Sequence, residues 1–136
     1  MTEYKVAREV AEAEFNALCE NVDIDNDVAN MSDEDQKGFE EQKAKLVRAI
    51  MRGALTFNDD GLPVYAPQRS DIPNALTFHE QTGAHLMAMD RKKDGQNVAK
   101  LLSLMDAMTK SAPGTCSKLN GADLKTCMAI ITLFLA

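Results

Sequence analysis

The first half of the chain carries two stretches in which apolar residues recur at helical spacing. In the first stretch Val6, Val10, Ala13 and Ala17 recur at intervals of four, three and four, with Leu18 beside them and acidic residues on the opposite side. Apolar positions at this spacing form one face of an α-helix, so we predict an amphipathic helix with a thin, alanine-rich buried face. Residues 21–31 show no such period and are predicted to form a loop.

The second stretch predicts a longer helix with well-defined ends. Ser32 is a candidate N-cap with Asp35 three residues later, and Gly53 can close the helix in the left-handed conformation. Acidic residues begin this helix and basic residues end it, as the helix dipole favours. Its apolar face is expected to consist of Phe39, Leu46, Val47, Ile50 and Met51.

The hydrophobic pattern changes in the middle of the chain. Residues 54–57 and 62–65 are short apolar segments that flank Asn-Asp-Asp-Gly, and Asp-Gly favours the positive φ of a hairpin turn. We therefore predict a small β-hairpin around residues 54–65. Residues 75–78 repeat the tetrapeptide Ala-Leu-Thr-Phe and are a candidate third strand, whereas prolines predict an exposed connection over residues 66–74.

The last third of the chain is predicted to be helical again. A short helix over residues 82–92 precedes a helix over residues 96–110, whose apolar face comprises Val98, Leu101, Leu102, Met105 and Met108. Asn120 and Asp123 are candidate caps for a final helix that runs to the end of the chain. Its apolar residues are Leu124, Cys127, Met128, Ile130, Ile131, Phe134 and Leu135.

These elements predict a mainly α fold, α+β at most, with one small β-hairpin. The 136 residues are 45% hydrophobic, which suits one domain with its own core. We expect a single domain over residues 1–136, with an acidic helical region at 1–52 and a hairpin and helical body at 53–136. No apolar run reaches membrane-spanning length, no signal segment is visible, and the three cysteines lack CxxC spacing. These features favour a cytoplasmic protein without membrane contact.

The formal charge of −6 is unevenly distributed along the chain. Residues 1–42 contain three basic and thirteen acidic residues, a net charge of −10, whereas residues 43–136 contain twelve basic and eight acidic residues, a net charge of +4. Nucleic-acid binding needs clustered Lys and Arg, so we expect none in the acidic part. We expect no nucleic-acid binding in residues 43–136 either, because their basic residues are not interleaved with aromatic ones. An acidic segment is typical of a solvated surface or of contact with a basic partner.

The acidic loop contains one candidate metal site. Asp23, Asp25 and Asp27 occupy positions 1, 3 and 5 of a twelve-residue window that ends at Glu34, which is the ligand spacing of an EF-hand calcium loop. The sixth position, where such loops use glycine, is the β-branched Val28, and Glu34 fits better in the first turn of the predicted helix. We therefore expect no metal ion, with these four acids as weak candidates, and keep a divergent calcium-binding helix–loop–helix module as an alternative.

No other arrangement of residues indicates catalysis or a cofactor. His79 and His85 lack the spacing of zinc ligands, the chain has no GxSxG, and residues 114–118 lack the second glycine of a P-loop. We therefore expect a protein that is not an enzyme and needs no cofactor. Methionine is abundant in the predicted C-terminal helices and makes adaptable binding surfaces. The candidate partner-binding residues are Met87, Leu101, Met105, Met108 and Phe134.

Several short motifs follow one another in the C-terminal two-thirds. After the hairpin come Leu76-Thr-Phe-His-Glu80, then Thr82-Gly83 and a helix, then Lys118-Leu119-x-x-x-Asp123-Leu124, and finally the apolar Ile130–Leu135. In this order they resemble the tail assembly chaperones of long-tailed bacteriophages, small acidic proteins encoded just before the tape measure protein. The resemblance covers residues 53–136, about 60% of the chain.

The resemblance implies a non-enzymatic protein that binds the tape measure protein, keeps it soluble and helps to recruit the tail tube protein. It also implies self-association into a homo-oligomer, a location in the host cell cytoplasm and absence from the mature virion. Many such proteins are also made in a longer, frameshifted form. We expect this function, and keep the calcium-binding module and a generic small phage or bacterial adaptor protein as alternatives.

Overall fold

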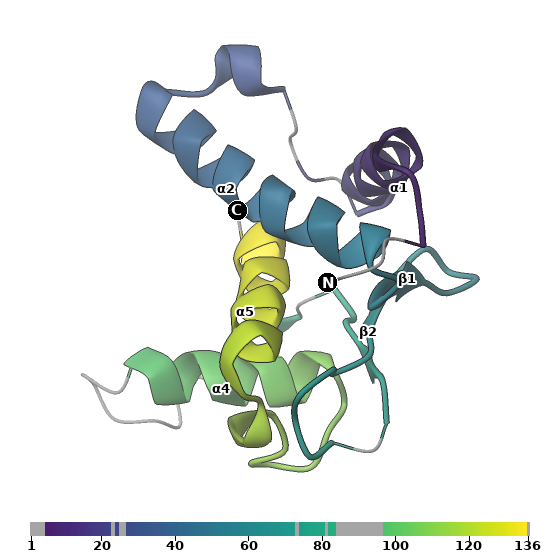
Figure 1. Ribbon diagram of the computed structural model, residues 1–136. Coiled ribbons are helices and arrows are strands. Elements are labelled where there is room, and N and C mark those ends of the chain that lie inside the picture. Colours follow the sequence, from purple (N-terminus) through teal and green to yellow (C-terminus); the bar gives the residue numbers. More distant parts are fainter. Residues whose placement is uncertain are drawn as a thin grey trace.

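A computed structural model describes residues 5–22, 24, 27–72, 74–80, 82–83 and 97–135 (Figure 1). Helices account for 58% of the structure and are accompanied by a small antiparallel sheet, so the predicted mainly α fold is confirmed. The elements of the described residues are α1 (Arg8–Asn21), η1 (Val28–Asn30), α2 (Asp33–Met51), β1 (Leu55–Phe57), β2 (Pro63–Tyr65), β3 (Leu76–Thr77), α4 (Asn97–Met108), η2 (Cys116–Lys118) and α5 (Gly121–Leu135).

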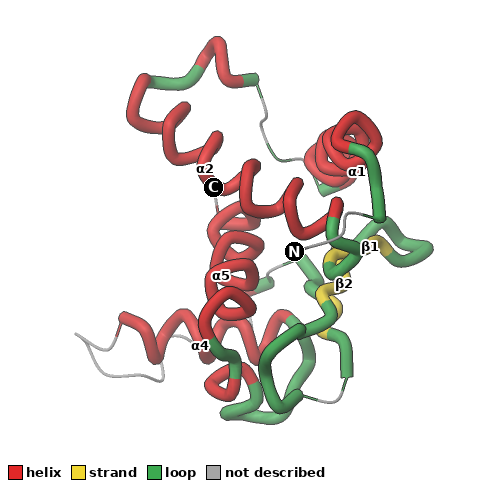
Figure 2. The backbone as a smooth tube through the Cα atoms, viewed as in Figure 1, coloured by secondary structure: helices red, strands yellow, loops and turns green. Residues whose placement is uncertain are grey.

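Helix α5 is central, and the other elements are arranged around it (Figures 1 and 2). α2 crosses one end of α5, whereas α4 lies across the other end. α1 packs against α2, and β1 also lies against this helix. The largest fully buried side chains of the core include Phe15, Leu46, Ile50, Leu55, Phe78, Leu104, Met105, Met108, Ile130 and Ile131.

The ends of α2 are those predicted from its sequence. The Asp35 N–H donates a hydrogen bond to the Ser32 hydroxyl oxygen at 3.2 Å, so Ser32 caps the first turn. At the other end Gly53 has a φ of 79° and donates its N–H to the Ile50 carbonyl. Leu46 and Ile50 are buried as expected. The first half of the helix is less buried than the second half.

The predicted hairpin and third strand are both present. Leu55 pairs with Tyr65 and Phe57 with Pro63, so β1 and β2 are antiparallel, and β3 pairs antiparallel with the other edge of β2. In the turn, the Asn58 side-chain oxygen accepts the N–H groups of Asp60 and Leu62. Gly61 has a φ of 78°, which explains the need for glycine there.

The predicted buried face of the first helix is wrong at three of its five positions. Val10 is 51% exposed, and Ala13 and Ala17 also face solvent. Leu18 is buried as expected and Val6 packs against the core, but the other buried residues of α1 are Ala11, Phe15 and Cys19. This face is preferred because Phe15 buries far more apolar area than any residue of the alanine-rich face.

Two further expectations about the C-terminal helices need correction. Val98 is 66% exposed at the start of α4, and the buried face of that helix includes Leu104 instead. Asp123 does not use its carboxylate to cap α5, because that group accepts hydrogen bonds from residues 65–70. The helix predicted over residues 82–92 lies mainly outside the described residues. In the described part of the chain, the helices are too short or too polar to span a membrane.

Candidate functional site

Three of the five residues proposed to contact a partner are buried. Met105 and Met108 are 0% exposed and Phe134 is 5% exposed, so these three side chains fill the core of the chain itself. Leu101 is only partly buried and packs against the same core. Met87 lies outside the described residues. The hypothesis fails for Met105, Met108 and Phe134 because α4 and α5 pack against each other and cover these apolar faces.

Of the four candidate metal ligands, the structure describes Asp27 and Glu34. Asp23 and Asp25 lie outside the described residues. Asp27 accepts a hydrogen bond from the Asn30 side-chain amide at 2.6 Å, and Glu34 lies exposed in the first turn of α2. Among the described residues, no group of three or more His, Cys, Asp or Glu side chains is placed to hold a metal ion.

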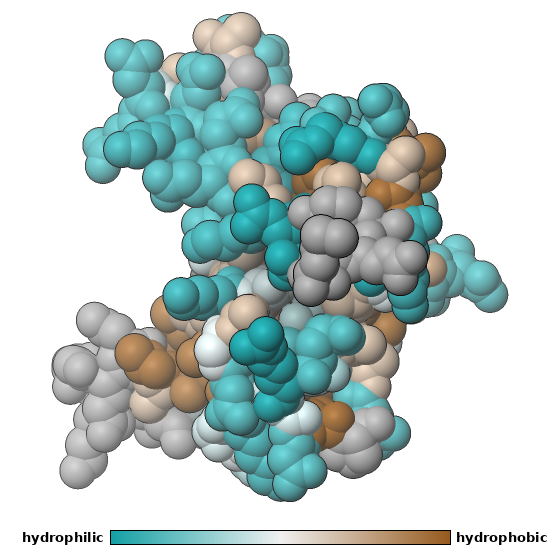
Figure 3. All heavy atoms as spheres, viewed as in Figure 1, coloured by the Kyte–Doolittle hydropathy of each residue, from teal (hydrophilic) through white to brown (hydrophobic). Residues whose placement is uncertain are grey.

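The first half of α2 projects beyond the body of the molecule (Figure 1). We call residues 31–42 the acidic arm; it contains five carboxylates and one lysine, a net charge of −4. All five of these carboxylates are exposed. Figure 3 shows this part as a hydrophilic lobe with a hollow beneath it. The acidic arm therefore offers two different faces, one toward solvent and one toward the hollow.

An apolar groove of about 420 Å³ lies between the acidic arm and the end of α5. The side chains of Met31 and Phe39 line it from the arm, and Leu133, which is 2% exposed, lines it from α5. An apolar centre with a polar rim is typical of a protein-binding surface. The polar lining residues are Asp35, Gln42 and Thr132.

Gly38 keeps one side of the apolar groove free of side chains. A Cβ placed on this residue would meet no atom within 4 Å, and its φ is not positive. Neither packing nor backbone conformation in this chain therefore requires glycine, although glycine inside a helix costs about 1 kcal/mol relative to alanine. The bare backbone lets another chain approach the helix closely.

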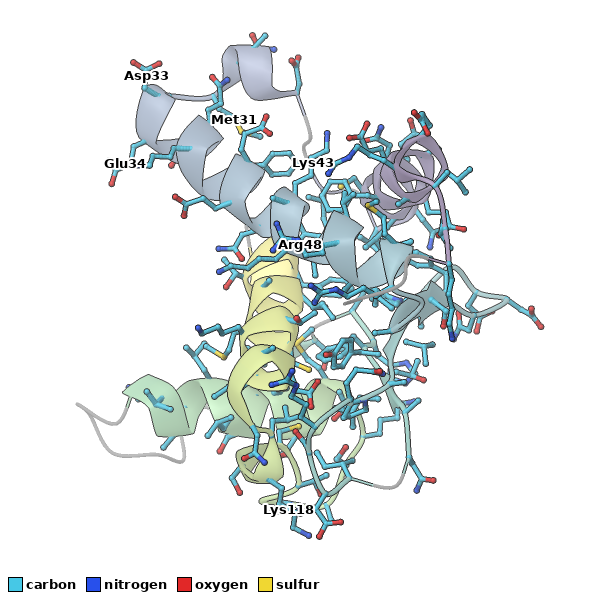
Figure 4. The ribbon with its side chains drawn as sticks, in the orientation of Figure 1. Met31, Asp33, Glu34, Lys43, Arg48 and Lys118 are labelled. Carbon is cyan, nitrogen blue, oxygen red and sulfur yellow. The ribbon has the colours of Figure 1, made fainter. Side chains whose placement is uncertain are left out.

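Helix α1 holds the Phe39 wall of the groove in place. The Phe15 and Phe39 rings pack edge to face with centroids 5.9 Å apart. The Lys43 ammonium lies 5.9 Å from the centroid of the Phe15 ring, close enough for a cation–π contact. Figure 4 shows Met31 and Lys43 along the same side of α2. The groove is therefore built on a helix that is supported by the core.

The sequence interpretation missed a buried hydrogen-bonded carboxylate in the first turn of α5. Asp123 is 1% exposed and accepts four hydrogen bonds of 2.6 to 2.9 Å, from the Tyr65 hydroxyl, the Gln68 and Arg69 N–H groups and the Ser70 hydroxyl. Burial opposes ionisation, but these hydrogen bonds outweigh it and hold the pKa of Asp123 below its usual value. Asp123 thus fixes the loop at residues 66–70 onto the start of α5.

A second buried carboxylate orders the connection between α4 and α5. Asp106 is 8% exposed and accepts the Gly114 N–H at 2.9 Å and the Cys116 N–H at 2.8 Å. These hydrogen bonds satisfy two backbone N–H groups that would otherwise be unpaired in the turn after α4. Asp106 and Asp123 therefore serve the architecture, because both carboxylates accept hydrogen bonds from other parts of the chain.

The three cysteines are buried thiols without the properties of a nucleophile. Burial raises the pKa of Cys19 to about 11 and that of Cys116 to about 12, and it also raises the pKa of Cys127. All three remain protonated at neutral pH, and a thiol in that state is a poor nucleophile and metal ligand. His79 donates its backbone N–H to the Met108 carbonyl, whereas His85 lies outside the described residues.

The sequence carried one signal for the apolar groove. A lone glycine inside a helical pattern often marks close packing or function, and Gly38 is such a residue. Thr132 and Leu133, which line the groove together with Gly38, lie almost one hundred residues later, so only the fold brings them together.

Comparison of the chain with family models, with curated proteins and with solved structures found no match.

Proposed function

We propose that the chain is a non-enzymatic tail assembly chaperone of a long-tailed bacteriophage, acting in the host cell cytoplasm. It binds an apolar helical stripe of the tape measure protein and keeps that protein soluble while tail tube subunits assemble around it. The observation that supports this proposal best is the apolar groove between the acidic arm and α5. The resemblance of residues 53–136 to tail assembly chaperones provides the biological context.

The shape of the groove suits a helical partner. The half-buried side chains of Met31 and Phe39 provide apolar contacts, and Gly38 permits a close approach of the partner backbone. Amphipathic helices bind such grooves through apolar residues at intervals of three and four. A tape measure protein is long and helical, so it can offer a series of such sites to many copies of the chaperone.

The acidic arm has a second role in this proposal. Its net charge of −4 lies beside the groove, and it keeps the complex in solution and attracts basic segments of the partner. Because these charges are exposed, their effect on the association rate is screened by salt. Apolar contacts in the groove retain the partner once it is bound, and these contacts depend little on salt.

Co-expression with a candidate tape measure protein tests the proposal. We expect the partner to be soluble and to co-purify with the wild-type chain, but to remain insoluble without it. The Gly38→Leu variant should bind at least about tenfold more weakly, because its side chain occupies the groove. Gly38→Ala is the matched control for helix content, since it strengthens α2 and adds only a methyl group.

The outcome distinguishes this function from a general adaptor. A tape measure protein that is equally insoluble with and without the chain would contradict the chaperone function. Binding of unrelated amphipathic helices with equal affinity, lost in Gly38→Leu, would instead identify a generic helix-binding adaptor. Equal binding by the wild type and Gly38→Leu would show that the partner does not occupy this groove.

A further inference from the structure

A second groove, lined by basic side chains, lies along the second half of α2. It measures about 400 Å³, and its other walls are the loop at residues 66–70 and the first half of α5. We call it the basic groove; its cations, all of them exposed, are Lys45, Arg48, Arg52, Arg69 and Lys125. Asp123 is the one carboxylate in its described lining, so the basic groove has a net charge of +4 in a chain whose overall charge is −6.

The dipole of α2 accounts for only part of this gathering of cations. Three of them lie toward the C-terminal end of α2, where the helix dipole favours positive charge. Arg69 and Lys125, however, come from a loop and from the start of another helix. Ala122, in the first turn of α5, also lines the basic groove, so the partial positive charge of that helix end adds to the cations. Tertiary structure therefore concentrates the charge.

The cations of α2 form a straight row along one face of the helix. Lys45, Arg48 and Arg52 follow one another at intervals of three and four residues. Side chains at these intervals are neighbours on a helix surface, with Cβ atoms about 5–6 Å apart. The seven residues from the first to the last of the three span about 10 Å along the helix axis. The row is therefore two helical turns long.

The floor of the basic groove is made of small or buried side chains. Ala49 and Ala54 are each 6% exposed, and Tyr65 is 3% exposed. Asp123, at 1% exposed, accepts four hydrogen bonds from residues 65–70, so those groups, and not the cations, hold its charge. The exposed cations thus surround a low floor, which leaves room for side chains of another molecule.

The neighbouring acidic residue of α2 reduces this charge only in part. Glu41 is exposed and lies one helical turn before Lys45, which is the spacing of a favourable pair on a helix surface. Counting Glu41 with the lining lowers the net charge from +4 to +3. Because exposed pairs of this kind are weak, the basic groove keeps a positive potential that attracts an anionic ligand.

We propose that the basic groove binds an acidic helix of a partner protein, with carboxylates that repeat at intervals of three and four residues. A helix lying alongside α2 presents its side chains at the same spacing as Lys45, Arg48 and Arg52. Arginine binds carboxylates through paired hydrogen bonds, so the arginines of the basic groove fix the register of the contact. Charge complementarity supplies the attraction and selects an acidic partner.

The lining favours such a helix over nucleic acid. Single-stranded nucleic acid is bound by aromatic side chains that stack on bases, next to cations that contact phosphates. Tyr65, the one aromatic residue of the described lining, is buried and donates its hydroxyl hydrogen to Asp123. A nucleic acid also carries charge along its whole length, and beyond the row of about 10 Å it would meet the acidic arm of the same helix. A protein helix carries its carboxylates only where cations face them.

Fluorescence anisotropy with a labelled synthetic peptide tests the proposal on the full chain. The stripe peptide is an alanine-based helix of about 20 residues whose glutamates repeat at intervals of three and four. The scrambled peptide has the same composition, with its glutamates spread around the helix. At about 20 mM salt we expect the stripe peptide to bind at least about fivefold more tightly than the scrambled one, and about tenfold more weakly at 500 mM salt. Equal binding of the two peptides, or no binding of either, would overturn the proposal.

Neutralising variants of the chain locate the contact. The groove variant, Arg48→Gln with Lys125→Gln, should bind the stripe peptide about tenfold more weakly than the wild type, with unchanged circular dichroism. The control variant, Arg8→Gln with Lys118→Gln, loses the same charge from exposed residues outside the described lining. Lys118 lies at the opposite end of the molecule from α2 (Figure 4). The control variant should bind like the wild type, and an equal loss in both variants would show that only net charge matters and overturn the proposal.

This inference is independent of the proposed chaperone function. The basic groove and the apolar groove share no residue of their described linings. Gly38→Leu should therefore leave binding of the stripe peptide unchanged, and the groove variant should still co-purify with the tape measure protein. Loss of the stripe peptide in Gly38→Leu would place the peptide in the apolar groove and overturn the proposal.

Two other occupants are tested with the same proteins. A labelled single-stranded oligonucleotide of about 20 nucleotides should bind more weakly than the stripe peptide at low salt. Tighter binding of the oligonucleotide, lost in the groove variant, would assign the basic groove to nucleic acid. Sedimentation velocity should give the wild type and the groove variant the same oligomeric state. An oligomer that the groove variant disperses would assign the basic groove to a second copy of the chain, and either result would overturn the proposal.

Discussion

Replacing Asp123 by asparagine should destabilise the fold more than its small change in shape suggests. One carboxylate oxygen accepts the Tyr65 hydroxyl and the Gln68 N–H, and the other accepts the Arg69 N–H and the Ser70 hydroxyl. In Asp123→Asn one of these oxygens becomes an NH₂ group, which cannot accept. The facing hydroxyl can turn and become an acceptor, but the facing backbone N–H cannot.

The magnitude follows from that loss. In either orientation of the asparagine, one backbone N–H of the loop loses its acceptor, at a cost of about 1–3 kcal/mol. The remaining bonds lose the carboxylate charge, and neutral hydrogen bonds are weaker than charge-assisted ones. Because Gln68 and Arg69 lie at the surface, water offsets part of the loss. We expect Asp123→Asn to lower the free energy of unfolding by about 2–3 kcal/mol, a large part of the ~5–15 kcal/mol of a typical domain.

Urea denaturation followed by circular dichroism measures this loss, and its pH dependence tests the cause. The folded-state pKa of Asp123 is lowered, so its contribution is complete above the unfolded-state pKa of about 3.9 and disappears as the pH falls through the folded-state pKa. The difference between wild type and Asp123→Asn should therefore be largest near neutral pH and shrink in acid. Asp71→Asn, an exposed carboxylate beside the same loop, should change stability by less than about 0.5 kcal/mol.

Two results would refute this reasoning. Equal stability of the wild type and Asp123→Asn at neutral pH would show that the four hydrogen bonds contribute little. A difference that persists unchanged in acid would show that the carboxylate charge is not its source.

Three further predictions concern other parts of the fold. Gly38→Ala should raise the free energy of unfolding by up to about 1 kcal/mol in urea titrations, because the added methyl group meets no atom; a loss of stability would mean that the groove is closed. Gly61→Ala should lower the free energy of unfolding by about 1–2 kcal/mol, since φ at this residue is 78° and the new Cβ would lie 2.5 Å from the Asn21 side-chain nitrogen. An unchanged free energy of unfolding would contradict this conformation of the turn. The three buried thiols should react with a thiol reagent only at the rate of unfolding, and rapid labelling of the folded protein would show that they are accessible.

Local signals in the sequence predicted the elements that depend on neighbouring residues. The N-cap at Ser32, the closing glycine at position 53 and the Asp-Gly turn each act over a few residues, and the structure contains all three. The buried face of α1 was misassigned because several faces of a short, alanine-rich helix are weakly apolar. Packing of Phe15 against Phe39 selects among them, and this contact joins different helices.

The apolar groove could not be predicted in the same way. It joins residues of the acidic arm to Thr132 and Leu133, which lie far away in the sequence, so the groove depends on the tertiary fold. The buried Asp123 was likewise interpreted as a helix cap, because its acceptor role depends on a loop more than fifty residues earlier.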